Sequence, residues 1–228
     1  MEKKNADKII IAVIAILIVI LAGFIFLQKK RQMAQPTQLP NVEVREYNGE
    51  NLSSINDIKD EGIKGTQNID VKNYTLQITG LVDDQRSLTY DQVLQLPKYS
   101  KVVDLNCVEG WSAKILWEGV LVKDLINAAG PQSGANTVIF AAQDGYTTSL
   151  PLDYLENNNI ILADKINGVV LPPAKGFPFQ LVAEQKWGYK WIKWITKIEL
   201  SNDPNYKGYW ESNGYSNNGD VNAPQFGN

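Results

Sequence analysis

The sequence predicts an α+β domain in which strands dominate, preceded by one transmembrane helix. Three observations support this fold class. An unbroken apolar run near the N-terminus is followed by about 200 residues with the composition of a globular domain. Within those residues the candidate strands and helices are short, mixed in order and separated by long loops. No internal repeat is visible, so a solenoid or a propeller is not expected.

The apolar run Ile9–Leu27 has 19 residues. At ~1.5 Å per helical residue it approaches the roughly 30 Å thickness of a bilayer core. A cleaved signal peptide is the alternative, but the run is long for one and no A-x-A cleavage site follows it. We therefore predict an uncleaved anchor. Lysine or arginine residues flank both ends, so charge fixes the orientation poorly; we expect the domain on the extracytoplasmic side of the cell membrane.

The organisation predicted from these patterns has five parts. Residues 28 to about 50 are polar, contain Pro36 and Pro40, and suggest a spacer. The stretch that follows, up to Val71, is loop-like. The predicted parts are an N-terminal flank (1–8), the anchor (9–27), a linker with an N-terminal extension (28–62), the main domain (63–216) and a tail (217–228).

Hydrophobic periodicity places the elements of the main domain. Leu76 and Ile78 alternate with polar residues, which indicates a strand. Thr89 is a candidate N-cap of a short helix that ends before Pro97. The other expected elements are strands at 101–105, 137–142, 160–162, 179–182 and 191–200, a helix at 117–129 and a helical turn at 152–155.

The composition excludes several classes of site. The chain has one cysteine and no histidine, so it can hold no internal disulfide, no Ser-His-Asp triad and no ordinary zinc site. Its formal charge of −3 gives no sign of nucleic-acid binding. A redox centre in this chain would have to use the single sulfur or oxygen ligands.

Cys107 follows the predicted strand 101–105 and precedes a Glu-Gly pair. Most lone cysteines are small buried hydrophobic residues. A thiolate on a loop at the end of a strand is instead well placed to bind a soft metal. The sequence leaves both interpretations open.

Two further stretches are candidates for binding. Lys190 and Lys193 lie among aromatic residues after Gly188 and could bind a phosphate, although an amphipathic strand end with solvated lysines would show the same pattern. Asp144-Gly145-Tyr146 is typical of a polar turn, and it could also place Tyr146 or Asp144 at the mouth of a pocket.

Taken in order, these motifs resemble the molybdopterin-binding domain of the sulfite oxidase family, particularly small prokaryotic members similar to the catalytic subunit of methionine-sulfoxide reductase. The resemblance runs from about Ile63 to Tyr215. Each motif is weak alone, but their shared order and spacing are specific. The motifs are 107–112 (CVEGWS), 117–121 (WEGVL), 144–148 (DGYTT), 167–172 (NGVVLP), 176–179 (GFPF), 188–194 (GYKWIKW) and 208–211 (GYWE).

The resemblance implies a mixed α+β fold that holds one Mo-molybdopterin. It assigns Cys107 as the thiolate ligand of the metal, and the stretch 190–193 as the contact to the phosphate of the cofactor. Glu109, Trp111 and Tyr146 become candidates for the pocket wall. The residues expected to bind the cofactor are Cys107, Lys175, Gln180, Lys190, Trp191, Ile192 and Lys193, and those expected to be catalytic are Cys107, Glu109 and Tyr146.

Three departures from the family pattern bear on function. Gln180 stands where many relatives have an arginine, and Lys175 stands where the reductase-like members have an asparagine, so positive charge could have moved between these positions. Ala142 falls close to a threonine contact of the family. Sulfite oxidases hold their oxyanion with arginines, whereas no arginine of this chain falls near a motif, which puts sulfite in doubt.

The predicted activity is oxygen-atom transfer to or from a small substrate such as a sulfoxide, an N-oxide or a sulfite-like anion. The sequence shows no second redox centre, so we expect a separate electron-transfer partner, for example a membrane-bound cytochrome or quinone-linked subunit. A monomer is expected. Two alternatives are a tethered binding module that keeps the fold without the metal, and a structural membrane-anchored domain that uses its aromatic residues for protein contacts.

Overall fold

The computed structural model describes residues 43–227 of the chain. The predicted anchor at 9–27 lies outside these residues. Within residues 43–227, no helix combines the length and the apolar character that a membrane span needs.

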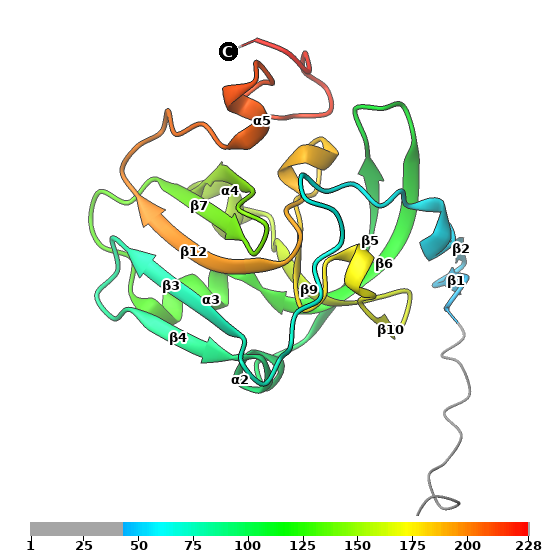
Figure 1. The fold of residues 1–228 in the computed structure, drawn as a ribbon, viewed down its shortest axis with the longest axis horizontal. Helices are drawn as coiled ribbons and strands as arrows, with labels where there is room; N and C mark the ends of the chain where they lie inside the picture. Colours follow the sequence, from blue (N-terminus) through cyan, green and yellow to red (C-terminus); the bar gives the residue numbers. More distant parts are fainter. Residues whose placement is uncertain (1–42, 228) are drawn as a thin grey trace, which may run out of the picture. The chain divides into compact units, whose positions relative to one another are not determined.

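Two five-stranded sheets form the framework of the domain (Figure 1). The first sheet has the order β10-β9-β6-β5, with β11 also paired to β9, and all its pairs are antiparallel. Its strands are β5 (Tyr99–Asn106), β6 (Ser112–Leu121), β9 (Ile161–Ile166), β10 (Val169–Val170) and β11 (Gln180–Val182).

The second sheet has the order β4-β3-β12-β7-β8. Its pairs are antiparallel except for β12 with β3, which is parallel. A mixed, strand-rich α+β fold was predicted, and it is confirmed. The strands are β3 (Thr75–Gly80), β4 (Arg86–Thr89), β7 (Thr137–Ala142), β8 (Thr147–Pro151) and β12 (Ile195–Ser201).

Short helices and one small hairpin complete the described chain. The α-helices are α2 (Tyr90–Leu94), α3 (Val122–Ala129), α4 (Leu152–Asn157) and α5 (Tyr209–Ser212). The 3-10 helices are η1 (Ile55–Asp57), η2 (Pro173–Lys175) and η3 (Gly188–Lys190), and the hairpin pairs β1 (Glu46–Tyr47) with β2 (Glu50–Asn51).

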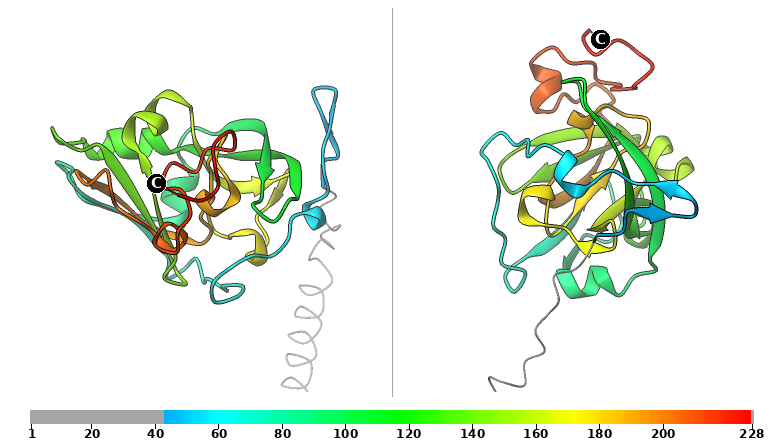
Figure 2. Two further views of the ribbon diagram at one scale, coloured as in Figure 1. Left: turned by 90° about the horizontal axis from the view of Figure 1, so that it is seen from above. Right: turned by 90° about the vertical axis from the view of Figure 1, so that its right-hand side faces the viewer.

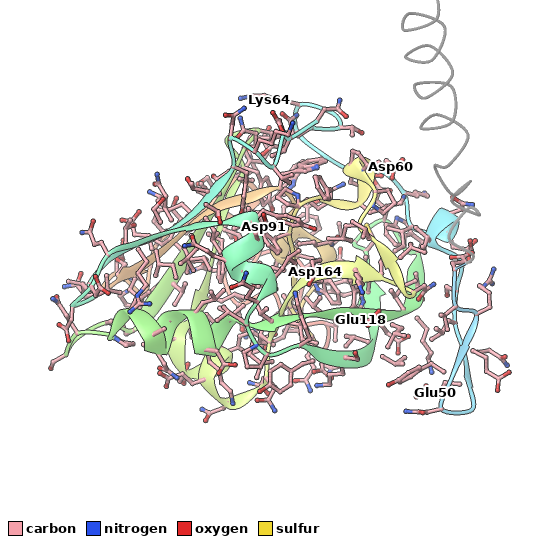
Figure 3. All side chains as sticks on the ribbon, turned by 90° about the horizontal axis from the view of Figure 1, so that it is seen from below. Glu50, Asp60, Lys64, Asp91, Glu118 and Asp164 are labelled. Atoms are coloured by element: carbon pink, nitrogen blue, oxygen red, sulfur yellow. The ribbon has the colours of Figure 1, made fainter. Side chains whose placement is uncertain are left out.

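Apolar side chains fill the space between the elements (Figure 3). Trp117, Phe140 and Phe179 are among the largest side chains that are fully buried. Removing such side chains from water supplies the main driving force for folding. Figure 2 shows that the C-terminal segment, which contains α5, lies over one end of this framework.

Several sequence predictions are confirmed at the level of single elements. Leu76 and Ile78 are fully buried on β3, and the predicted strands 101–105 and 137–142 are β5 and β7. Thr89 caps α2 through a capping box, in which its side chain accepts from the Gln92 amide and the Gln92 side chain accepts from the Thr89 amide. Strands β4 and β8 were not predicted.

The helix predicted at 117–129 is wrong in its first part. Residues up to Leu121 belong to β6, and the helix α3 begins at Val122. Most residues of β6 are buried on both faces of the sheet, so the strand forms a continuous apolar run. Such a run is hard to distinguish from a buried helix by periodicity. Val122, Leu125, Ile126 and Ala129 form the buried apolar face of α3, and Gly130 ends the helix with φ 69°.

The strand predicted at 191–200 begins only at Ile195. Trp194 has φ 55°, a left-handed backbone conformation that interrupts extended structure. The preceding residues therefore form a bend between η3 and β12. This bend, rather than a strand end, carries Ile192 and Lys193.

The N-terminal extension is not a simple spacer in its described part. The Val44 amide donates to the Asn167 carbonyl at 2.9 Å, and the Ser53 amide donates to the Lys114 carbonyl at 2.8 Å. Ile58 is buried in the core. Residues 43–62 thus pack on the domain, and the last of them reach the site described next.

Candidate functional site

A cavity of about 400 Å³ opens at one end of the domain. Loops and turns from distant parts of the sequence line it. The lining residues are Ile58, Lys59, Glu61, Gly62, Ile63, Leu105, Cys107, Val108, Glu109, Trp111, Asp144, Tyr146, Lys175, Gln180, Gly188, Tyr189, Trp191, Ile192, Lys193, Trp194, Tyr209, Trp210 and Tyr215. The structure therefore brings together nearly all the residues predicted from the sequence.

Cys107 begins the tight loop that joins β5 to β6. Its amide donates to the Trp111 carbonyl at 2.9 Å, and Gly110 adopts φ 86°, which a residue with a side chain rarely does. The hairpin thus holds the thiol at the wall of the cavity. Partial burial raises the pKa of the Cys107 thiol, and the Glu109 backbone amide opposes that rise. The free group is therefore a thiol near neutral pH.

Lys193 also lines the cavity and is mostly buried. Its Nζ donates to the Ala174 carbonyl at 3.1 Å and lies 4.6 Å from the centre of the Trp194 ring. No carboxylate of residues 43–227 forms an ion pair with it. Burial lowers the pKa of Lys193 to about 8, although Asp60 partly opposes this shift. An anion in the cavity would supply the missing charge partner.

The side chain of Lys190 does not line the cavity. It is fully buried and pairs with Glu211, Nζ to Oε1 at 2.5 Å, while also donating to the Ser149 carbonyl at 3.0 Å. Thr148 donates to the same Glu211 oxygen. Burial lowers the pKa of Lys190, and the negative charge of Glu211 opposes that shift. Contact of Lys190 with a cofactor is thus restricted to its backbone.

Lys175 and Gln180 are both buried and both line the cavity. Nζ of Lys175 donates to the Ile58 carbonyl and pairs with Asp60, which Figure 3 labels. The charge of Lys175 is therefore already matched by the chain. Gly176 has φ 100°, and an added Cβ there would meet Gln180 and Lys193 at 3.1 Å. The backbone turn at Gly176 thus allows these side chains to approach one another.

Tyr146 and Asp144 stand in the turn between β7 and β8. The Tyr146 amide donates to the Asp144 carboxylate at 2.9 Å, which fixes the turn. The Tyr146 hydroxyl donates to the Tyr189 carbonyl at 2.5 Å. Burial first, and then the charge of Glu211, raise the pKa of Tyr146 well above its usual value. Tyr146 therefore remains a neutral phenol that holds η3 in place.

Glu109 and Trp111 complete the loop that carries Cys107. Glu109 is about half exposed and lies 3.6 Å from Nζ of Lys59, so the pair links this loop to the N-terminal extension. The indole N–H of Trp111 is buried and has no hydrogen-bond partner in residues 43–227. An unpaired buried donor beside a cavity favours a polar ligand within it. Both residues line the cavity, as expected from the sequence.

Two sets of lining residues were not predicted as site residues. The first is the segment from Ile58 to Ile63, which was assigned mostly to a linker. The second is the aromatic set Tyr209, Trp210 and Tyr215 from the C-terminal segment. The sequence does show the motif 208–211, in which two aromatic residues, Tyr209 and Trp210, are adjacent. The structure shows that both are exposed.

Comparison with known proteins identifies the family. Residues 63–210 match the model of the oxidoreductase molybdopterin binding domain. The chain belongs to this family. It is therefore a molybdopterin-dependent oxidoreductase of the sulfite oxidase type.

Relatives and a solved structure agree with this assignment. The chain is 38% identical to an uncharacterized oxidoreductase of Bacillus subtilis, over 66% of this chain and 76% of the relative. It is 31% identical to a protein-methionine-sulfoxide reductase catalytic subunit of Gluconobacter oxydans, over 72% and 58%. The sulfane dehydrogenase SoxCD of Paracoccus pantotrophus shares the fold, with TM-score 0.59, 21% identity and coverage of 61% and 41%.

The residues of the cavity fit a molybdopterin. The cofactor brings a phosphate, and Lys193 is a mostly buried cation without a carboxylate partner among the described residues. It brings polar pterin atoms, and Trp111 offers a buried donor that has no partner in the described part of the chain. It brings a soft metal, and Cys107 presents a thiol. The cation, the hydrogen-bond donor and the thiol thus match the phosphate, the pterin and the metal of one cofactor.

Proposed function

We propose that this chain is a membrane-anchored reductase of sulfoxides, with its catalytic domain on the extracytoplasmic side. Several relatives bear the name protein-methionine-sulfoxide reductase, and those alignments span only about half to three-fifths of the relatives' own length. The single observation that carries the proposal is the meeting of Cys107 and Lys193 in one cavity. The predicted anchor at 9–27 supports attachment to the membrane.

The residues of the chain divide the work of holding the cofactor. Cys107 would hold the metal as a thiolate, and its proton would be released on binding. Lys193 would pair with the phosphate. Trp191, Ile192 and Gln180 border the space between them. Lys175 contributes less charge, because Asp60 already neutralises it.

The bound molybdenum centre supplies oxygen-atom transfer coupled to a two-electron change. The balanced reaction takes a sulfoxide, two electrons and two protons to a thioether and water. The electrons come from a separate membrane-bound electron-transfer partner of the cytochrome or quinone-linked type. The side chain assigned to deliver these protons is Glu109, which is half exposed on the loop of Cys107 and lines the cavity.

Sulfite is the less favoured substrate. An oxyanion needs fixed positive charge near the metal. Among the described residues that line the cavity there is no arginine. Lys175 pairs with Asp60, and Lys59 pairs with Glu109 at 3.6 Å. In the proposed arrangement Lys193 pairs with the phosphate of the cofactor. A neutral sulfoxide needs no such cluster.

The test uses the full chain, loaded in a host that makes the cofactor. Reduction of dimethyl sulfoxide is followed with a chemical electron donor, and bound molybdenum is measured by elemental analysis. Wild type should reduce the sulfoxide, and Cys107→Ser should lose turnover while remaining folded. The matched control is Ser112→Ala, an exposed position after the same loop, which should keep both molybdenum and activity. Turnover by Cys107→Ser equal to wild type would refute the assignment.

The location is tested separately. Protease added to intact cells should digest the domain if it lies outside the cytoplasmic membrane. Protection in intact cells, with digestion after lysis, would place it inside and overturn this part of the proposal.

A further inference from the structure

The cavity has two ends of different chemistry, connected by the segment 188–194. At one end, Gly188 packs against the Cys107 loop, where an added Cβ would lie 3.5 Å from Cys107 Cα and 3.4 Å from the Asn106 carbonyl oxygen. At the other end, the side chain of Lys193 lies against Gly176. The thiol and the unmatched cation therefore stand at opposite ends of the segment.

Aromatic rings gather at the thiol end. Tyr189, next to Gly188, packs on Tyr215 with ring centres 5.1 Å apart, and Tyr215 packs on Trp210 at 5.3 Å. Trp210 meets Tyr209 edge to face at 5.2 Å, and Tyr209 lies 5.9 Å from Tyr146. These contacts form one continuous wall, and each of its members lines the cavity.

Two of these rings remain open to solvent. Tyr209 is 41% exposed and Trp210 is 37% exposed, whereas Tyr189 is buried. Large apolar side chains at the mouth of a cavity are the usual form of a binding surface for an apolar group. Both lie on α5, at the end of the domain seen at the top of Figure 1.

The exposed rings are held rigidly from below. Glu211, between them and the interior, is fully buried in its pair with Lys190. Gly208 lies so close to β8 that an added Cβ would come within 2.2 Å of the Thr147 carbonyl oxygen. The Tyr189 hydroxyl donates to the Ser216 carbonyl at 2.7 Å. A rigid aromatic surface binds a ligand with little loss of conformational entropy.

We propose that Tyr209, Trp210 and Tyr215 form a subsite for the apolar arm of the substrate, and that it selects sulfoxides with an aryl or similarly large apolar substituent. A sulfoxide whose oxygen reaches the thiol end would place its substituents beside these rings. Aromatic and sulfur-containing groups pack favourably on aromatic faces. This inference rests on the proposed sulfoxide reductase function and names the residues that decide its specificity.

The test compares two sulfoxides on the loaded full chain. Methyl phenyl sulfoxide carries an aryl arm, and dimethyl sulfoxide lacks one. Trp210→Ala should raise KM for the aryl substrate about tenfold with kcat nearly unchanged, which corresponds to losing roughly one aromatic contact. Its kinetics with dimethyl sulfoxide should change less than about twofold.

Phe226→Ala is the matched control. Phe226 belongs to the same C-terminal segment, is 61% exposed and packs on Tyr215, but it does not line the cavity. It should leave the preference for the aryl substrate unchanged. An equal loss in both variants would show that disturbance of the segment, and not a contact of Trp210, is the cause, and would overturn the subsite.

A binding measurement separates this proposal from the reaction. Methyl phenyl sulfone has the same arm and is not reduced, so its affinity can be measured by calorimetry without turnover. Trp210→Ala should weaken sulfone binding by the same factor that it raises KM. If wild type reduces neither sulfoxide, the proposed function fails while the sulfone still tests the subsite. Equal sulfone affinity in wild type and Trp210→Ala would refute the subsite alone.

Discussion

Lys190 and Lys193 belong to one short segment, and both are largely removed from water, yet they differ in their partners. Lys190 has a buried carboxylate, Glu211, against its ammonium group. Within residues 43–227, the partners of the Lys193 ammonium group are only the Ala174 carbonyl and the face of Trp194. The first cation is satisfied by the fold, and the second is satisfied only when an anion enters the cavity. The pair shows that burial alone does not mark a ligand-binding charge; the missing partner does.

The largest effect expected from this comparison concerns Lys190. Lys190→Met should lower the free energy of unfolding by about 3–5 kcal/mol, because it leaves Glu211 charged and unpaired in the interior. The double variant Lys190→Met with Glu211→Leu should recover most of the loss. Urea unfolding of the chain purified without cofactor measures both.

Lys197→Met serves as the control for that experiment. Lys197 pairs with Glu199 at 2.6 Å, but both side chains are more than a third exposed. Its removal should cost less than about 1 kcal/mol. A small effect at Lys190, similar to that at Lys197, would contradict the view that the buried pair fixes the C-terminal segment.

Substitution of Lys193 should change the free energy of unfolding less than substitution of Lys190, and should raise it. Its pKa of about 8, against an ordinary value of 10.5, means that keeping it charged near pH 7 costs up to about 3 kcal/mol in the cofactor-free chain. Lys193→Met should therefore stabilise the cofactor-free protein, while lowering the molybdenum recovered per chain from a cofactor-making host. A variant that is less stable and equally well loaded would refute the role given to Lys193.

The stability difference between Lys193→Met and wild type should depend on pH, because the pKa of Lys193 is lower in the folded chain than in the unfolded chain. Between about pH 8 and 10.5 the unfolded wild type binds more protons than the folded one, so wild-type stability rises with pH in this window. Lys193→Met lacks this titration. The stability advantage of the variant should therefore be full below pH 8 and shrink as pH rises through the window. Unfolding midpoints at pH 7 and pH 9.5 measure it, and an advantage that grows with pH would contradict the assignment.

The smallest effect tests how the segment between the two lysines is held. Tyr146→Phe removes the hydrogen bond from the Tyr146 hydroxyl to the Tyr189 carbonyl. It should cost about 1 kcal/mol of stability, a value typical of one hydrogen bond. Thermal unfolding measures this loss. An unchanged melting temperature would show that Tyr146 does not fix η3.

The sequence predicted much of this site because its motifs lie in locally determined turns. The loop of Cys107 needs Gly110 at positive φ, and the turn of Tyr146 needs the carboxylate of Asp144, so residue types alone suggest both. The capping box at Thr89 is equally local. Such features depend on neighbours within a few residues, which is the range over which sequence patterns carry information.

The features of the site that the sequence did not predict depend on contacts between residues far apart in the chain. Nothing in the spacing of Lys190 and Lys193 shows which of them faces the cavity, because that depends on the left-handed bend at Trp194 and on Glu211. Packing of the N-terminal extension depends on pairs such as Lys175 with the Ile58 carbonyl. The aromatic wall likewise requires the C-terminal segment to fold back over η3. Long-range pairings of this kind leave no local pattern.

X-ray absorption at the molybdenum edge tests the central claim most directly, namely that the sulfur of Cys107 is a ligand of the metal. The spectra of loaded wild type and loaded Cys107→Ser are compared on samples with equal molybdenum content. The account predicts one sulfur neighbour fewer around molybdenum in the variant than in wild type. Identical sulfur coordination in the two samples would contradict it.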